Sequence, residues 1–164
     1  MPSGSAHNTI HKSWVFRVDP KFYNIEEALR TLSEHTLLVQ QHRQEIKIND
    51  KVYIWRSGPA PAILAKGIVV EEPIDSEPDV QEHKFLAQPL RFKGKRCRVR
   101  VRAVMFPSAL THARMKSDSA LASWYLLDGL EGTNFRVSAD IEAALERLAA
   151  SIATRTTGVT AGNP

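Results

Sequence analysis

Basic residues are crowded into one short stretch of the sequence, and they suggest binding of a negatively charged polymer. Seven of the twelve residues from 91 to 102 are lysine or arginine. From Arg98 to Val101 basic and apolar residues alternate, which is the period of a half-buried strand, so its arginines are expected to project into solvent on one face. Cations this close together repel one another, and a phosphate backbone is their natural counter-charge. The candidate phosphate-binding residues are Arg56, Lys95, Arg98, Arg100 and Arg102.

An acidic stretch offers a second explanation for the same pattern. Residues 71–82 carry six carboxylates, interrupted by prolines and polar residues that are typical of a solvated loop. The basic strand would then be a solvated sheet face that this acidic loop neutralises. The sequence leaves both explanations open.

A second group of interest stands where a β-prone run meets a turn. Residues 51–56 read KVYIWR, and SGPAP follows before a second branched run at 63–70. Glycine and proline end the first run, so the two runs predict antiparallel strands at 51–56 and 62–71. Trp55, Arg56 and Ser57 then lie at a strand end, where loops often carry function on a rigid scaffold. Trp55 as a plain core aromatic fits the sequence equally well.

Catalytic arrangements are missing from the sequence. It contains no phosphate-cradling glycine loop and no nucleophile-elbow pattern. Its six histidines are scattered, without the spacing of a helical metal pair. The single cysteine, Cys97, cannot form a disulfide within one chain or a cysteine-based zinc site. We therefore expect a binding protein without metal or cofactor, not an enzyme.

Length and composition favour one ordinary globular domain. The chain has 164 residues, a formal net charge of +4 and a pI near 9.4, which permits an anionic partner. No apolar run approaches the roughly 20 residues needed to cross a bilayer, so no membrane partner is expected. The lone cysteine fits a reducing setting, and we expect a cytoplasmic location.

The order of the expected elements predicts an α+β fold. A strand at 13–18 is followed by a helix near 24–33, with Asn24 as its cap, then by several strands and a last helix near 139–149. This order lacks the regular strand–helix alternation of a parallel sheet, so a mostly antiparallel, curved or barrel-like sheet is expected. We expect a disordered lead at 1–12, one domain over 13–150, and a flexible tail at 151–164.

Four segments in a fixed order resemble the EVE domain, a member of the PUA-like superfamily that also includes the YTH readers. They are SWVFRVDPKFY at 13–23, IKINDKVYIWRSG at 46–58, ILAKGIVVEEP at 63–73 and DGLEGTNFRVS at 128–138. The resemblance implies a small PUA-like, barrel-like sheet with helices around it. It also implies a reader of modified bases, most often modified cytosines in DNA, that is frequently the specificity part of a modification-dependent nuclease system.

The resemblance also implies where the base would bind. A flipped base needs an aromatic or apolar surface and a few polar groups for its pairing edge. The match places Trp55, Ser57 and Gly58 on one wall, with the indole as the stacking surface. It places Arg17, Val18 and Asp19 on the other wall, where Asp19 could accept a hydrogen bond from an exocyclic amino group.

The sequence departs from its relatives at several of these positions. Leu37 stands in a segment where many relatives have a tryptophan, so it offers apolar contact without a ring face. Val18 replaces a serine, and Asn49 replaces a turn glycine but tolerates the same left-handed geometry. Phe92, before the Lys93-Gly94-Lys95 turn, is a candidate second ring, although a partly buried loop aromatic is the plainer interpretation.

These observations predict a nucleic-acid-binding module whose aromatic pocket accepts a flipped modified base. A modified cytosine in DNA is the expected ligand, and RNA is the second choice. A nuclease or other effector protein is the expected protein partner. The alternative is a small-molecule or protein-interaction module on the same PUA-like fold, with the pocket degraded at Leu37 and Val18.

Overall fold

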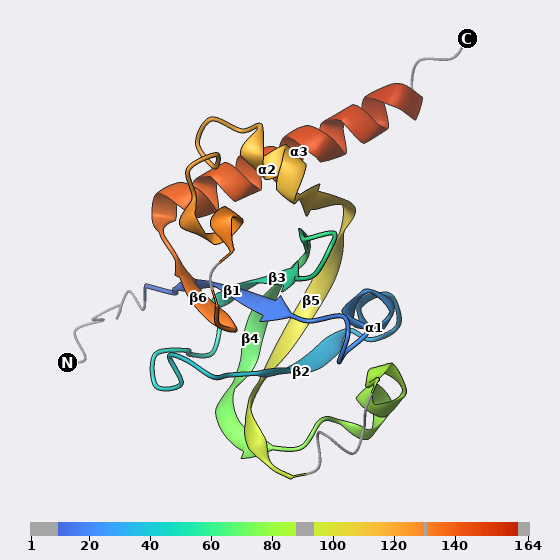
Figure 1. Cartoon of the computed structure of the whole chain (residues 1–164), viewed down its shortest axis with the longest axis vertical. Helices are drawn as coiled ribbons and strands as arrows, with labels where there is room; N and C mark the ends of the chain where they lie inside the picture. Colours follow the sequence, from blue (N-terminus) through green and yellow to red (C-terminus); the bar gives the residue numbers. More distant parts are fainter. Residues whose placement is uncertain (1–9, 88–93, 130, 161–164) are drawn as a thin grey trace, which may run out of the picture.

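The fold combines six strands with several short helices and one long last helix, without a regular alternation between the two (Figure 1). The computed structural model describes residues 10–87, 94–129 and 131–160, with side chains as far as Thr154. Most of the expected lead at 1–12 therefore lies outside the described residues. The elements are β1 (Ser13–Val18), α1 (Ile25–Thr31), β2 (Glu34–Leu38), β3 (Lys51–Arg56), β4 (Ala62–Ser76), η1 (Val80–Phe85), β5 (Arg96–Thr111), α2 (His112–Lys116), η3 (Tyr125–Asp128), β6 (Asn134–Val137) and α3 (Ala139–Thr160).

The six strands form one sheet in the order β2-β5-β4-β3-β1-β6. The expected hairpin is confirmed: β3 and β4 are antiparallel neighbours, and Trp55 lies opposite Ile63. Next to the edge strand β6, β1 runs parallel to β3, while the other neighbouring pairs are antiparallel. Because parallel strands end at the same edge, the segments that follow Val18 and Arg56 emerge side by side.

The sheet is strongly curved but is not closed into a barrel, so the barrel-like expectation is only partly met. β4 and β5 are long, and their ladder shifts register at three places, which bends both strands. The edge strands β2 and β6 share no ladder. Instead, the buried Asn134 side chain joins them: its Nδ2 donates to the Leu38 carbonyl at 3.1 Å, and its Oδ1 accepts from Gln40 N at 2.8 Å.

The helices begin where the sequence predicts, but the last one ends later. The Asn24 side chain caps α1 by accepting a hydrogen bond from Glu27 N at 3.4 Å. α3 continues to Thr160, beyond the expected end of the last helix near 149. Among the described helices, none is both long and apolar enough to cross a membrane.

Hydrophobic residues pack on both faces of the sheet. Alternate residues of β1 and β3 point to opposite faces, so Val15, Tyr53 and Trp55 join one cluster while Phe16 and Ile54 join the other. We call the first cluster the helix-side core, because α3, α2 and η3 contribute to it. We call the second the α1-side core, because α1 and the strands β2, β4 and β5 contribute to it.

Candidate nucleic-acid interface

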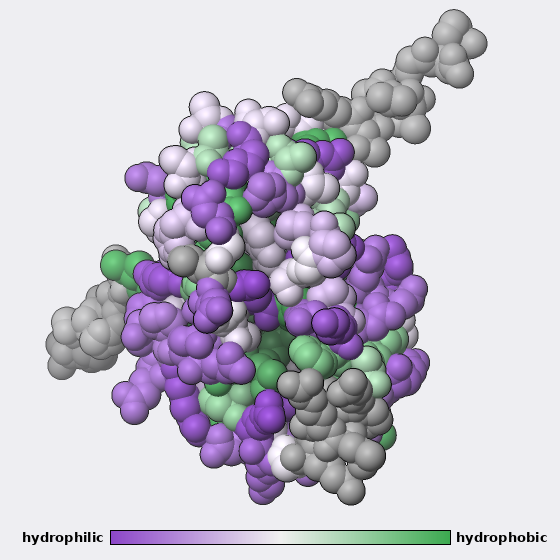
Figure 2. Space-filling view, in the orientation of Figure 1, coloured by the Kyte–Doolittle hydropathy of each residue, from purple (hydrophilic) through white to green (hydrophobic). Residues whose placement is uncertain are grey.

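A cavity of about 500 Å³ opens beside the end of β1, on the α1 side of the sheet (Figure 2 shows the hollow, with apolar residues in its depth). Its walls come from the segment after β1, from β2, from the start of β5 and from the loop before β6. Its volume lies within the range of roughly 300–1,000 Å³ that ligand pockets occupy. The cavity is therefore large enough for a nucleobase.

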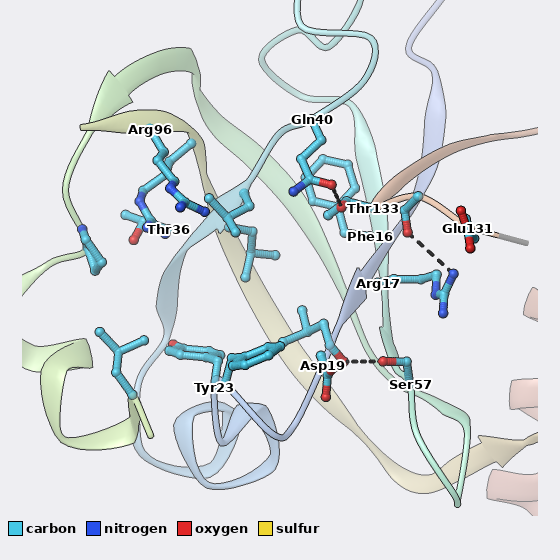
Figure 3. Close-up of a pocket in the computed structure, with 18 of the residues that line it drawn as sticks. Phe16, Arg17, Asp19, Tyr23, Thr36, Gln40, Ser57, Arg96, Glu131 and Thr133 are labelled. Atoms are coloured by element: carbon cyan, nitrogen blue, oxygen red, sulfur yellow. Dashed lines mark hydrogen bonds between the residues drawn. The ribbon is translucent and has the colours of Figure 1, made fainter. Parts of the chain in front are cut away.

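The cavity brings together five of the seven residues that the resemblance assigned to a base pocket. They are Arg17, Val18, Asp19, Leu37 and Ser57. The parallel pairing of β1 and β3 explains this convergence: Ser57 N donates to the Val18 carbonyl at 3.0 Å, and Ser57 Oγ lies 3.3 Å from the same oxygen. Figure 3 shows Asp19 and Ser57 next to each other on one wall.

Trp55 and Gly58 do not line this cavity, contrary to the expectation from the resemblance. Trp55 is 5% exposed and belongs to the helix-side core, where its ring meets the edge of Trp124 at 6.3 Å between ring centroids. The alternation of β3 turns the indole away from the α1 side, to which Ile54 points. Gly58, the residue after Ser57, has a φ of +103°, in the left-handed region that favours glycine.

The aromatic surface of the cavity comes from other residues, which the sequence argument missed. Phe16, Phe22 and Tyr23 line it, together with Leu38 and Leu86. Figure 3 labels Phe16 and Tyr23 among the residues of the wall. All three aromatics lie within the SWVFRVDPKFY segment that carried the resemblance. The two-residue period of a strand would have placed Phe16 on the same face as Val18. Phe92 lies outside the described residues.

Polar side chains from the loops complete the walls. Figure 3 shows Gln40 and Thr133 together on one wall, where the Thr133 hydroxyl donates to Gln40 Oε1, and Glu131 near them. Arg17 lies at the margin, and its Nη1 is 3.5 Å from the Gly132 carbonyl. Asp19 Oδ1 accepts from Lys21 N at 2.9 Å, which holds the carboxylate in a tight turn. The cavity thus combines a ring-lined wall with acceptors and donors at its edge.

A buried carboxylate fixes the position of Tyr23. Glu82 is fully buried and accepts hydrogen bonds from Tyr23 Oη at 3.0 Å, from Thr36 N at 2.8 Å, from Asp79 N at 3.0 Å and from the Thr36 hydroxyl. Burial, and then the charge of Glu82, raise the pKa of Tyr23. The phenol therefore stays protonated, and its ring is held against the cavity.

The candidate phosphate-binding arginines do not form one solvent-facing row. Arg98 is 4% exposed and lines the cavity, so its expected exposure is wrong. Arg100 makes two hydrogen bonds to Asp79, at 2.6 and 3.0 Å, and lies within 3.6 Å of Glu34 and Glu71. This pairing raises the pKa of Arg100 and lowers that of Asp79.

The remaining candidates also differ from one another. Arg102 is exposed and pairs with Glu34 at 3.0 Å. Arg56 donates to the Ala60 carbonyl and to Glu26 at 2.8 Å. Lys95 is exposed. The explanation by neutralisation from the acidic stretch therefore holds for Arg100, which pairs with Glu71 and Asp79. Arg102 pairs instead with Glu34 of β2, and Arg98 belongs to the cavity.

In the part of the chain that the structure describes, no three His, Cys, Asp or Glu residues are grouped as metal ligands. The cavity presents apolar surfaces that suit a ring and polar atoms that suit the edge of that ring.

The fold can be compared with those of known proteins. The structure resembles a protein from Leishmania major, with a TM-score of 0.63 at 18% identity, covering 86% of this chain and 96% of that one. It resembles a Pseudomonas putida protein with a TM-score of 0.60 at 21% identity, covering 84% and 99%. It also resembles human THYN1, solved in complex with DNA containing 5-methylcytosine, with a TM-score of 0.61 at 14% identity, covering 84% and 97%.

These likenesses show a shared fold of six strands and a few helices. The family model of the EVE domain matches residues 12–148, nearly the whole described chain, and no curated protein matches its sequence. This chain belongs to the EVE domain family.

Proposed function

We propose that this chain is a nucleic-acid-binding module that accepts one flipped, modified base, a modified cytosine in DNA, in the cavity beside β1. The observation that carries the proposal is the combination of a ring-lined wall with polar groups at the rim of a single cavity. The fold shared with human THYN1, which was solved with 5-methylcytosine DNA, supports the same class of ligand.

The cavity residues suit a base taken out of its stack. A flipped base has lost its neighbours, and stacking against an aromatic side chain restores about 1–3 kcal/mol. Phe22 and Tyr23 supply such surfaces at the cavity. Asp19 carries a carboxylate, which can accept from the exocyclic amino group that cytosine presents. The net charge of +4 favours a polyanionic ligand in general.

In this proposal the chain reads the base and does no chemistry on it. A partner such as a nuclease would act on the marked strand. The module would then resemble other readers in separating recognition from catalysis.

The test is binding to oligonucleotides that differ only in one central base: cytosine, 5-methylcytosine or another modified cytosine. The Phe22→Ala variant removes a half-buried ring from the cavity and should lower the free energy of binding to the preferred oligonucleotide by about 1–3 kcal/mol. Binding to the unmodified strand should change little, because phosphate contacts carry no base information.

The matched control is Tyr125→Ala, which removes a half-exposed ring from η3, outside the cavity. It should leave every affinity unchanged. If wild-type protein binds all oligonucleotides equally, or if both variants lose the same affinity, base reading in this cavity is ruled out. The interpretation as a small-molecule or protein-interaction module would then take its place.

A further inference from the structure

Four arginines at alternate positions of β5 share one face of that strand, yet they divide into two pairs. They are Arg96, Arg98, Arg100 and Arg102. Carboxylates surround the second pair, as described above for Arg100 and Arg102. Within the described residues, no carboxylate lies within ion-pairing distance, 4.0 Å, of Arg96 or Arg98. Both residues of this first pair line the cavity.

The guanidinium of Arg98 is enclosed but incompletely bonded. Its Nε donates to the Ser76 carbonyl at 3.2 Å, whereas its buried Nη2 has no hydrogen-bond partner among the described residues. The buried carboxylate of Glu82 already accepts four hydrogen bonds from other groups. A buried charge with an unused donor costs free energy until an acceptor arrives.

Arg96 adds a second positive charge beside this one. It is exposed and lies two residues before Arg98 on the same strand, and Figure 3 shows it at the end of the cavity away from Ser57. Burial lowers the pKa of Arg98, and the charge of Arg96 lowers it further, against the opposing effect of Glu82. Two cations that repel each other across a cavity wall create a local preference for an anion.

We infer that Arg96 and Arg98 form an anion subsite at one end of the base cavity, which binds negatively charged oxygens of the incoming nucleotide. Those oxygens belong either to a phosphate of the nucleotide or to an acidic substituent on its base. The inference rests on the proposed function for the identity of the ligand. A guanidinium can hold two such oxygens in a fork, a geometry that lysine lacks. Because Nη2 has no exposed surface in the free chain, the Arg98 side chain has to turn toward the cavity when the anion binds.

The experiment compares two variants: Arg96→Gln and, as a matched control, Arg102→Gln. The control removes an exposed charge from the same strand but outside the cavity. The probes are single-stranded oligonucleotides with one central 5-methylcytosine or 5-carboxylcytosine. Arg96→Gln should weaken binding of the preferred probe about tenfold, the equivalent of one charged hydrogen bond. Arg102→Gln should change it less than about twofold.

Two further arms identify the source of the anion. If it is a phosphate, neutral methylphosphonate linkages beside the 5-methylcytosine weaken wild-type binding, and Arg96→Gln causes no further loss on that probe. If it is a base substituent, 5-carboxylcytosine binds about tenfold more tightly than 5-methylcytosine, and Arg96→Gln abolishes the preference. Either pattern supports the subsite.

A readout without nucleic acid separates this inference from the proposed function. Pyrophosphate should raise the midpoint of thermal unfolding of the wild type and of Arg102→Gln, but not of Arg96→Gln. That result supports the subsite even if no oligonucleotide binds, an outcome that would end the base-reading proposal. The subsite is ruled out if Arg96→Gln, an exposed position that does not endanger folding, matches Arg102→Gln in all of these assays.

Discussion

The two faces of the central sheet carry similar aromatic residues but have different surroundings. On the helix side, Trp55 and Tyr53 lie under α3 and the loops that follow β5, and the packing leaves Trp55 only 5% exposed. On the α1 side, Phe16 is also buried, but the cover ends near the end of β1 and leaves the cavity beside it. Aromatic content therefore does not distinguish a binding face from a core face; the extent of the cover does.

The same contrast applies to charge. Arg98 and Arg100 are neighbours on one face of β5. The carboxylate of Asp79 pairs with Arg100 and not with Arg98. Arg98 instead lines the cavity without a carboxylate partner among the described residues, and its buried Nη2 is an unused donor. Pairing makes Arg100 structural, and the lack of pairing leaves Arg98 available. The predictions below test this division between closed and open regions.

The largest effect is expected for Trp55→Ala. The substitution opens a void in the helix-side core and removes the contact with Trp124, so it should lower the free energy of unfolding by about 3–5 kcal/mol. Chemical denaturation measures the loss. Affinity for oligonucleotides, corrected for the folded fraction, should stay at the wild-type value. If Trp55→Ala keeps its stability but loses base selectivity, the indole lies in the base-binding site and the helix side of the sheet is not a closed core.

Glu82→Gln should have the next largest effect. The amide carries no charge and presents two N–H donors to a site that already holds four donors, so stability should fall by about 2–3 kcal/mol. Tyr23 would also lose its anchor at the cavity, so selectivity should decline with stability. Glu77→Gln is the matched control, since Glu77 is an exposed carboxylate of the same stretch. Equal, small effects of both substitutions would contradict a supporting role for Glu82.

A smaller effect should appear as a pH dependence. His35 is fully buried in β2, and this burial lowers its pKa below the ordinary 6.5, although the nearby carboxylates of Glu82 and Glu34 oppose the shift. The unfolded chain therefore takes up a proton first as the pH falls. Stability should be complete above pH 6.5 and should decline below it, by at most about 1.4 kcal/mol per pH unit.

Denaturation at several pH values between neutrality and pH 5 measures this slope. His35→Leu should remove it, whereas the exposed His42→Asn should retain it. An unchanged slope in His35→Leu would assign the pH dependence to other groups.

Local features of the fold could be predicted from the sequence because they depend on neighbouring residues. The turn at SGPAP, the cap at Asn24 and the left-handed Asn49, with its φ of +73°, each follow from the properties of one or two side chains. The meeting of Asp19 with Ser57 followed from one topological expectation, that the two strand ends open on the same rim.

The rest depends on how distant segments pack. Trp55 points to the face of the hairpin that α3 covers. The two faces of β3 are too similar in sequence to show which of them α3 covers. The burial of Arg98 depends on the docking of residues 76–86 over β5, where Glu82 becomes a core group despite a loop-like sequence. The length of α3 was missed because small and polar residues follow position 150, which resemble a frayed end.

Ser57→Ala should give the smallest effect on stability and the most specific test of the comparison. Ser57 lies past Arg56, the last residue of β3, so it escapes the alternation that turns Trp55 inward, and it reaches the cavity wall. Its hydroxyl makes one long contact, 3.3 Å to the Val18 carbonyl, so its removal should cost no more than about 1 kcal/mol of stability. In the complex the same hydroxyl can meet the edge of the base, so preference for the modified oligonucleotide over the unmodified one should fall by up to about tenfold. Trp55→Ala and Ser57→Ala should therefore give opposite results in the two assays, although the residues are two positions apart. Equal losses in stability and selectivity for both variants would mean that the two faces are not separate in function.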